Sequence, residues 1–382
     1  MVKYLRSKAK SLIEKVKVMD ASLRHQHDSS PSGMNGGHDE AFTIHGFVFC
    51  EGKNQDEGED AEPISENREG RGVLAVFDGM GGAGSEKYRT KEGDTHTGAY
   101  FASRIVRELI YSHFSYLIDS KNTSSINAEI LAELKQSLII QLRERWNGFE
   151  KNPSRIKTSL RKKLPTTLAS IYFFLEENHC AYDVVWAGDS RAYLLMPEGL
   201  QQLSRDDVKA STDALSDLTQ DSPLSNCISA DSDFELRHVS FRGELPIIFV
   251  VATDGCYGYV QTPAHFEQML LQCLQKSNDD REWGAQISAS LRAISGDDYS
   301  MSVICLGWRG FASIKKAFQD RIEQVNSIVT PIDDIITEIN QFDSRMRDLE
   351  KEKESCLNRK KEVYADFWSS YRIVYEKRLR ED

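Results

Sequence analysis

The sequence lacks any apolar run long enough to cross a lipid bilayer. Its longest wholly apolar runs are about as long as Ile247 to Ala252, whereas a membrane-spanning helix needs about 20 apolar residues. The amino terminus, MVKYLRSKAK, is charged and has no apolar core of the secretory-signal type. With 382 residues, 40% of them hydrophobic, the chain can bury one large core. These features predict a soluble protein with no transmembrane segment.

Cysteine pairs at metal-binding spacing are also absent. The seven cysteines are scattered and odd in number, and no two of them form a C-x-x-C pair. Such a set indicates neither a disulfide framework nor a zinc site. Together with the missing secretory signal, it predicts a reducing, cytoplasmic location. The cysteines are Cys50, Cys180, Cys227, Cys256, Cys273, Cys305 and Cys356.

The chain has no overall excess of positive charge. Its net charge is −11, with seven basic and two acidic residues in residues 1 to 25, and 14 basic and 15 acidic residues in residues 311 to 382. Residues 26 to 310 therefore carry a net charge of −15. An acidic centre disfavours nucleic acid as a partner and favours cations or basic partners.

Composition divides the chain into three regions. Residues 1 to 38 combine a basic amphipathic helix, expected between residues 3 and 24, with a polar linker. The helix is expected to be solvated or to pack on the rest of the protein, and contact with an anionic membrane surface is the less favoured interpretation. Residues 39 to 310 form the central region, and residues 311 to 382 form an extension.

The central region alternates between strand-type and helix-type patterns. Strand-type runs such as GVLAVFDG, TTLASIYFFLE and IIFVVATDG often follow one another with no helical pattern between them. Helical patterns cover residues 100 to 113, 127 to 146, 265 to 275 and 283 to 293. This order predicts an α+β fold with antiparallel sheets and helices outside them, not a doubly wound parallel sheet.

The extension has the pattern of a coiled coil or of a helical hairpin. No glycine occurs after Gly310, and apolar residues recur at steps of three and four. Thr330, Pro331 and Asp333 match an N-cap, a first-turn proline and an acidic first turn, so a helix is expected to restart there. The extension is expected either to bind a protein partner or a second copy, or to pack on the central region. The seam consists of Phe318, Ile322, Val325, Val329, Ile332, Ile336, Ile339, Phe342, Met346 and Leu349.

The stretch VLAVFDGMGGAGSE, Val73 to Glu86, allows two interpretations. Gly79 to Gly84 match G-x-G-x-x-G, a dinucleotide-binding fingerprint. Asp78, however, precedes the first glycine, so a bound pyrophosphate would face its carboxylate with no cation between them. The next segment, SEKYRTKEGDTHT, is too polar for the helix that should pack behind such a loop. A metal-binding loop is therefore the favoured interpretation.

Three further turns centred on aspartate stand at the ends of strand-type runs. Asp189 lies in AGDSR, Asp254 in ATDGC and Asp297 in GDDYS. Charged residues beside apolar strands are costly unless something compensates them, and a shared divalent cation would compensate all of them. Carboxylates with no neighbouring Cys or His suit Mg²⁺ or Mn²⁺ and argue against zinc.

With these turns in view, the sequence resembles a known family. The segments VFDGMGGAG, TTLAS, AGDSRAYLL, QLSRDD, ATDGCYGYV and GDDYS occur in this order between Phe42 and Trp308. The series is similar to the bacterial-type metal-dependent protein phosphatases of type 2C, the PPM family. The resemblance implies an α-β-β-α sandwich of two antiparallel sheets, with the phosphatase domain in residues 39 to 310. It also implies a binuclear Mn²⁺ or Mg²⁺ site at one end of the sandwich.

The same resemblance implies the metal ligands. Asp78 would bridge both ions, Gly79 would bind one of them through its carbonyl, and Asp254 and Asp297 would hold the other. Asp189 would serve a weaker third ion.

The early acidic segment GKNQDEGEDA contains a further candidate. Asp56 would match the aspartate with which the family positions metal-bound water. Two alternatives stay open, because Asp60 could replace Asp56 and Asp298 could replace Asp297.

Phosphate binding departs from the family pattern. Many relatives have an arginine five residues before the early aspartate, where this chain has Glu51. Lys53 is the candidate replacement, acting on the substrate phosphate as a point charge without bidentate geometry; alternatively, it is only a turn residue. Arg191 is expected to pair with a local carboxylate and not with substrate.

The activity implied is hydrolysis of phosphoserine and phosphothreonine in a protein substrate. Two adjacent divalent ions would lower the pKa of a bridging water, and the hydroxide would attack phosphorus without a phosphoenzyme. The alternative is a weakly active or inactive phosphatase-fold scaffold that acts through its helical extension.

Overall fold

The computed structural model describes residues 44 to 53, 58 to 119, 125 to 150, 161 to 209, 215, 223 to 231 and 233 to 380. The predicted basic helix and linker of residues 1 to 38 lie outside the described residues, and so does Asp56. No helix among the described residues is both long enough and apolar enough to span a bilayer.

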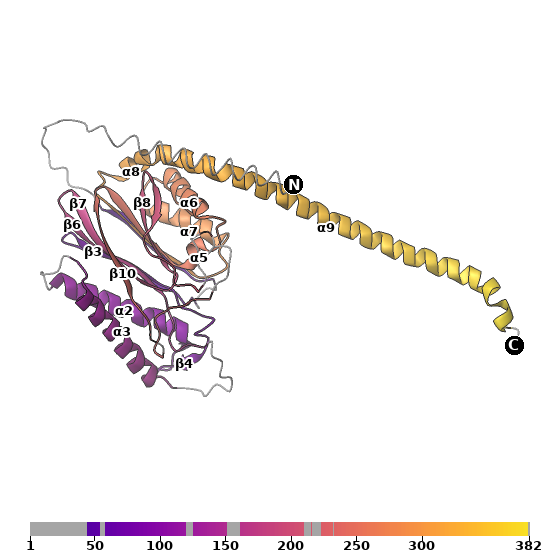
Figure 1. Cartoon of the computed structure of the whole chain (residues 1–382), viewed down its shortest axis with the longest axis horizontal. Coiled ribbons are helices and arrows are strands. Elements are labelled where there is room, and N and C mark those ends of the chain that lie inside the picture. The colour runs from indigo at the N-terminus through magenta and orange to yellow at the C-terminus, as the bar shows by residue number, and fades with distance from the viewer. Residues whose placement is uncertain are drawn as a thin grey trace. The chain divides into compact units, whose positions relative to one another are not determined.

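Two five-stranded sheets form the centre of the fold (Figure 1), and every strand pairing within them is antiparallel. The first sheet contains, in spatial order, β1 (His45–Glu51), β12 (Tyr299–Leu306), β11 (Ile247–Ala252), β8 (Arg191–Met196) and β9 (Gly199–Gln202). The second contains β10 (Arg237–Glu244), β7 (His179–Ala187), β6 (Leu168–Glu176), β3 (Arg71–Phe77) and β2 (Ala61–Arg68).

The central strands are apolar on both faces because each face contacts a different layer. All six residues of β11 are buried. Ile248, Val250 and Ala252 belong to the core shared with the helices over the first sheet. Their neighbours Ile247 and Phe249 belong to the core between the two sheets. Alternate residues of a strand point to opposite faces, so an uninterrupted apolar run is what a doubly covered strand requires.

Helices cover the outer face of each sheet, which completes four layers (Figure 1). The helices α2 (Gly98–Asp119) and α3 (Ala128–Gly148) pack on the second sheet, and α6 (Pro263–Lys276) and α7 (Asp280–Arg292) pack on the first. Three of these helices begin at side-chain caps, in which Asn127, Thr262 and Asp279 accept hydrogen bonds from backbone N–H groups. The predicted α-β-β-α sandwich of antiparallel sheets is confirmed.

Two polar segments form strands that apolar periodicity does not reveal. The strand β2 contains Pro63, which is tolerated because β2 lies at the edge of its sheet. The polar segment after the glycine loop forms the hairpin β4 (Lys87–Arg89) and β5 (Thr95–Thr97), not a helix. The absence of a helix directly behind the loop agrees with rejecting the dinucleotide interpretation.

The extension is helical and its first part belongs to the domain core. It consists of α8 (Phe311–Ala317), the long α9 (Gln319–Tyr375) and a final 3₁₀ turn at Lys377–Arg380. The residues of its first part that are buried in the core beneath α6 and α7 are Phe311, Ile314, Phe318, Val325 and Val329. The later seam residues Ile339, Phe342, Met346 and Leu349 are exposed.

The expected restart of a helix at Thr330 and Pro331 is wrong, because α9 passes through Pro331 without a break. The Thr330 hydroxyl donates to the Asn326 carbonyl and does not cap a new helix. An interior proline costs about 3 kcal/mol. Burial of Val325 and Val329 anchors the turns on the amino-terminal side of the proline, and helix-favouring Glu, Lys and Arg residues follow it.

Candidate active site

A cavity of about 530 Å³ opens where strand ends from both sheets meet. Asp78 follows β3, Asp254 follows β11, and Asp189 lies between β7 and β8. The cavity is lined by six acidic residues together with the glycine loop: Glu59, Asp78, Gly79, Met80, Gly81, Gly82, Ala83, Asp189, Leu224, Asp254, Asp297 and Asp298. The fold thus brings together Asp78, Gly79, Asp189, Asp254 and Asp297, all five of which the sequence predicts as ligands.

The TTLAS segment fixes the backbone of Asp78. The Thr166 hydroxyl donates to the Asp78 carbonyl at 2.6 Å, and the Thr167 N–H donates to the same carbonyl at 2.9 Å. These two residues directly precede β6, so they hold the carbonyl in place while the Asp78 side chain lines the cavity.

The turn that carries Asp189 is tight and held from several sides. Gly188 has φ of +102°, a conformation that favours glycine. The Thr167 and Ser190 hydroxyls are hydrogen-bonded at 2.6 Å, and the Tyr257 hydroxyl donates to the Asp189 carbonyl. Asp189 Oδ1 is buried and has no hydrogen-bond partner among the described residues. A buried carboxylate oxygen without a partner is costly, so this atom is suited to a cation.

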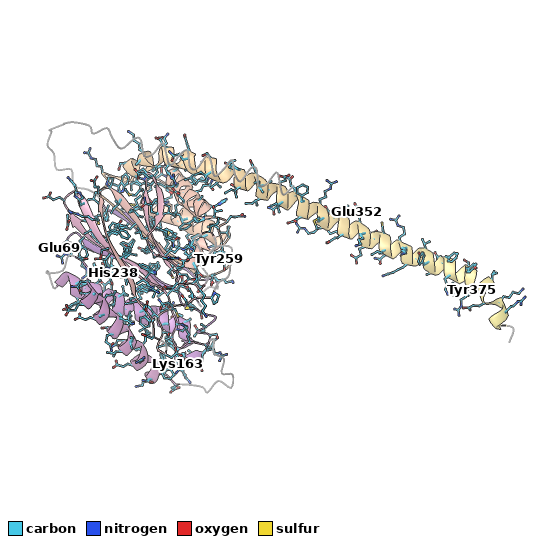
Figure 2. The ribbon with its side chains drawn as sticks, in the orientation of Figure 1. Glu69, Lys163, His238, Tyr259, Glu352 and Tyr375 are labelled. Atoms are coloured by element: carbon cyan, nitrogen blue, oxygen red, sulfur yellow. The ribbon has the colours of Figure 1, made fainter. Side chains whose placement is uncertain are left out.

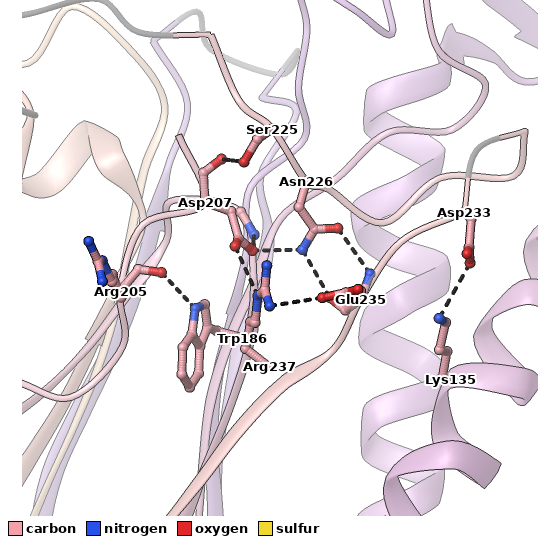
Figure 3. Close-up of polar contacts among 10 residues, drawn as sticks. Lys135, Trp186, Arg205, Asp207, Ser225, Asn226, Asp233, Glu235 and Arg237 are labelled. Atoms are coloured by element: carbon pink, nitrogen blue, oxygen red, sulfur yellow. Dashed lines mark hydrogen bonds and ion pairs between the residues drawn. The ribbon is translucent and has the colours of Figure 1, made fainter. Parts of the chain in front are cut away.

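A network beneath this turn connects it to the QLSRDD segment (Figure 3). Asp207 accepts hydrogen bonds from the Gly188 N–H at 3.2 Å, from Asn226 at 2.6 Å and from Arg237 at 3.1 Å. The Trp186 indole N–H donates to the Arg205 carbonyl at 2.7 Å. These contacts keep the loop after β9 against the backbone that presents Asp189.

Arg191 pairs with Asp206, as predicted, and not with the cavity. The two side chains are 2% and 3% exposed and approach to 2.6 Å. The guanidinium also lies 3.9 Å from the centroid of the Tyr257 ring. Arg191 is therefore a structural residue that supports the site from below.

Asp254 begins the short helix α5 (Asp254–Tyr257), and the glycine after it is required by a close backbone approach. A Cβ on Gly255 would lie 1.9 Å from the Asp298 carbonyl oxygen. The absence of a side chain at Gly255 therefore lets the two aspartate turns lie against each other.

Asp60, the alternative to Asp56 in the early acidic segment, is part of this acidic group. It is buried, and its Oδ2 accepts hydrogen bonds from Thr253 at 3.0 Å and from Ser300 at 2.8 Å. Asp56 lies outside the described residues, so its role stays a prediction. The Thr253 and Ser300 hydroxyls stand 193 and 240 residues from Asp60, and no sequence signal links them to it.

Asp297 and Asp298 have different surroundings. Both line the cavity. The Asp298 carboxylate accepts hydrogen bonds from the backbone N–H groups of Lys53 at 2.7 Å and Glu59 at 2.6 Å. Asp298 therefore ties the early acidic segment to β12, and Asp297 is left as the better ligand candidate of the two.

Lys53, the candidate phosphate-binding residue, belongs to the same early acidic segment. Lys53 is exposed and is not one of the residues that line the cavity. Glu51 forms an exposed ion pair with Arg292 at 3.0 Å. Contact of Lys53 with a substrate phosphate stays a prediction.

Burial and mutual repulsion oppose ionisation of the acidic group. Burial, followed by the charge of Asp254, raises the pKa of Asp78 and Asp189 well above the usual range of a carboxyl. Burial raises the pKa of Asp254 to about 6, with Asp297 as the next cause. Burial also raises the pKa of Asp60 to about 7, with Asp254 contributing. A bound cation would counteract both effects, because it favours the ionised form of each carboxyl and so lowers its pKa.

The donor set fits a hard divalent cation. Within the part of the chain that the structure describes, no group of three or more His, Cys, Asp or Glu side chains forms a ready-made metal site. The cavity nevertheless offers carboxylate and carbonyl oxygens with no Cys or His among its lining residues, and one of those oxygens, Asp189 Oδ1, is buried without a partner. Such a set suits Mg²⁺ or Mn²⁺.

No curated protein matches the sequence. Solved structures share its fold at low identity. PstP/Ppp of Mycobacterium tuberculosis, a serine/threonine phosphatase, is 18% identical, with a TM-score of 0.47 over 69% of this chain and 99% of its own. Stp1 of Staphylococcus aureus, also a serine/threonine phosphatase, is 17% identical, with a TM-score of 0.48 over 72% of this chain and 99% of its own.

One further structure has a bound metal. The catalytic domain of PstP, in complex with two manganese ions, is 18% identical and has a TM-score of 0.45 over 69% of this chain and 97% of its own. These likenesses concern the fold alone.

A family model decides the identity. The model described as Protein phosphatase 2C matches residues 52 to 294, which is more than half of the chain and includes Asp78, Asp189 and Asp254. Asp297 lies just beyond the matched segment, at the same cavity. The four-layer fold, the order of the motifs and this match together show that the chain belongs to the protein phosphatase 2C family.

Proposed function

We propose that this protein is a metal-dependent phosphatase that hydrolyses phosphoserine and phosphothreonine in protein substrates. The observation that carries the proposal is the convergence of six acidic residues from distant segments on one cavity. A purely structural role does not explain such a group, because crowded carboxylates that are in large part withdrawn from water destabilise the fold unless a cation accompanies them.

The residues that would hold two Mn²⁺ or Mg²⁺ ions are Asp78, the Gly79 carbonyl, Asp254 and Asp297. Asp189, with its partnerless Oδ1, would hold a weaker third ion. When bound, such ions neutralise charge on the phosphoryl oxygens and lower the pKa of water between them. Family membership supports this assignment.

The protein's own contribution is to hold these oxygens in place and to admit phosphate only together with cations. Thr166 and Thr167 fix the Asp78 backbone, and Thr253 and Ser300 fix Asp60. A phosphate monoester is dianionic near neutral pH, so the acidic cavity repels it until cations reverse the local charge. Asp60, or alternatively Asp56, would orient water beside the phosphate.

Lys53 would attract the substrate phosphate from the rim. Its backbone is tied to Asp298 at 2.7 Å, so its position depends on the same segment that carries the acidic ligands. Its ammonium would act on binding more than on the chemical step, since it is a mobile point charge.

The proposal is tested with purified full-length protein and a phosphothreonine peptide. Turnover is expected only with added Mn²⁺ or Mg²⁺ and is expected to stop with EDTA. Asp254→Asn should lower kcat by at least about 100-fold, since the ligand charge is lost. Asp320→Asn, on the exposed surface of α9, is the matched control and should retain full activity.

Two outcomes count against the proposal. Turnover that survives EDTA would reject metal dependence. Metal binding by calorimetry without any turnover of several phosphopeptides would favour the alternative, a phosphatase-fold scaffold that acts through α9.

A further inference from the structure

The part of α9 beyond Asp334 carries an apolar seam that no described residue covers. Figure 2 shows side chains pointing away from this part of the helix, with Glu352 and Tyr375 labelled. Seven large apolar seam residues are between 46% and 72% exposed: Ile339, Phe342, Met346, Leu349, Val363, Phe367 and Val374. Exposed apolar surface of this extent in a soluble protein indicates an interaction site.

The seam follows a heptad repeat. From Ile335, steps of four and three give twelve core positions: Ile335, Ile339, Phe342, Met346, Leu349, Lys353, Cys356, Lys360, Val363, Phe367, Ser370 and Val374. Nine of these positions are apolar or cysteine. At a rise of about 1.5 Å per residue the seam is roughly 60 Å long. A repeat of this kind is typical of a two-stranded coiled coil.

Charge along the seam disfavours a parallel pairing of two identical helices in register. Lys353 and Lys360 would each face the same lysine of the second copy across the core. Glu338 would flank Asp343 of the second copy, which adds a repulsion between like charges.

The two halves of the seam carry opposite net charge. Residues 335 to 354 hold six acidic and four basic residues, whereas residues 355 to 374 hold two acidic and four basic residues. An antiparallel pair places each acidic half beside a basic half. Antiparallel pairing is therefore favoured by charge complementarity.

One antiparallel register satisfies both the core and its flanks. It pairs Ile335 with Val374, Phe342 with Phe367, and Met346 with Val363 of the second copy. Lys353 and Lys360 then face Cys356 and Leu349, and their long side chains can extend to solvent.

The flanking positions in this register bring together opposite charges. Arg345 faces Asp366 of the second copy, and Glu352 faces Arg359. Each pair occurs twice by symmetry, and no like charges meet. In the part of the chain that the structure describes, Arg345, Glu352 and Asp366 form no intrachain ion pair, so their charges are available to a partner.

We infer that the protein forms an antiparallel homodimer through residues 335 to 374 of α9, with the dyad between Glu354 and Ser355. The first turns of α9 pack on α6 of their own domain. The two phosphatase domains therefore lie at opposite ends of the paired helices. This inference does not depend on catalytic activity.

Charge reversal tests the register. Sedimentation equilibrium of the full chain near physiological salt should show a monomer–dimer equilibrium. Arg345→Glu should weaken the dimer by about tenfold or more, because two attractive pairs become repulsive. Adding Asp366→Arg should restore dimerisation, whereas adding Glu350→Arg should not. Restoration by Glu350→Arg would show parallel pairing and overturn the inference.

Core substitution provides the second arm. Phe342→Glu should give a monomer, and Trp368→Ser, which removes an exposed aromatic outside the seam, should leave the dimer intact. All these positions are exposed, so the thermal unfolding of the phosphatase domain should not change. A wild-type chain that stays monomeric at high micromolar concentration would overturn the inference, and the seam would then serve a different partner.

Cysteine cross-linking distinguishes direction without relying on charge. In a Cys356→Ser background, a chain with Met346→Cys is mixed with a chain carrying Val363→Cys, and mild oxidation is followed by mass spectrometry of the linked peptides. Disulfides should join position 346 to position 363. Linkage of position 346 to itself in the single variant would contradict the antiparallel register.

Discussion

Asp60, Asp78, Asp189 and Asp254 share an environment in which burial and neighbouring negative charge both oppose ionisation. These carboxyls therefore have folded-state pKa values above the unfolded value of 3.8. Such groups favour the folded state while they are protonated, and this advantage is lost as the pH rises through the folded-state pKa. The same feature that suits the site to cations destabilises the metal-free protein.

In EDTA, the melting temperature is expected to fall as the pH rises from about 7 to about 8.5, with a loss on the order of 1 to 3 kcal/mol. The reason is that the folded state still holds protons on these carboxyls, whose pKa values are raised, whereas the same carboxyls are already ionised in the unfolded state. Differential scanning calorimetry measures the change. This pH interval lies above the titration of His113, whose pKa burial lowers to about 4. At lower pH His113 has the opposite effect on stability, because the unfolded state gains a proton on this side chain before the folded state does.

Asp189→Asn is the matched variant for this test. It should melt at a higher temperature than the wild type in EDTA at pH 8.5 and should show a smaller decrease with pH. Saturating Mn²⁺ should reverse the order of the two proteins. A metal-free melting temperature that rose with pH over this interval would contradict the assignment.

At the scale of elements, α9 is fastened to α6 by a partly buried polar contact as well as by apolar packing. Arg321 donates to both carboxylate oxygens of Glu267 at 2.7 and 2.9 Å, and the two side chains are 14% and 7% exposed. Gln268 donates to Asn326 one turn further along. A bidentate pair with a fixed geometry defines the rotation of α9 on the domain.

Arg321→Ala is expected to destabilise the domain by about 2 to 4 kcal/mol, because it leaves the Glu267 carboxylate buried without its partner. The double variant Glu267→Gln with Arg321→Met should lie closer to the wild type than the single variant does. Urea unfolding followed by tryptophan fluorescence measures both. Equal loss in the two variants would show that the guanidinium acts through packing alone.

At the scale of the whole molecule, the extension has two parts with different roles. Residues 311 to 329 complete the core over the first sheet, with Phe311, Ile314 and Phe318 buried beside α6 and α7. Residues beyond 338 within α9 are exposed. The boundary between the buried and the exposed part of the extension therefore falls inside α9, not at its beginning.

A chain ending at Asp334 is expected to remain folded and active but to be monomeric, because it keeps every buried residue of α8 and α9 and lacks the dimer seam. A chain ending at Gly310 loses five large buried side chains and should be destabilised by on the order of 5 to 10 kcal/mol. Circular dichroism melting and sedimentation of both chains provide the comparison. Equal stability of the two chains would contradict this division.

The sequence by itself indicated the layers of the fold and most of the acidic residues that line the cavity. Uninterrupted apolar runs specify doubly covered strands such as β11. Aspartate–glycine turns at strand ends specify Asp78 and Asp254, because strand ends in a sandwich meet at common edges. These patterns are local, and each is legible from a few neighbouring residues.

Tertiary structure alone decided which groups hold the neighbouring carboxylates and how far α9 continues. The hydroxyls that hold Asp60 come from Thr253 and Ser300, and Asp298 is occupied by backbone groups of the early segment. The helix passes Pro331 with Val325 and Val329 packed against the domain. In each case a contact between residues far apart in the chain supplies the deciding free energy. A local sequence pattern does not encode such a contact.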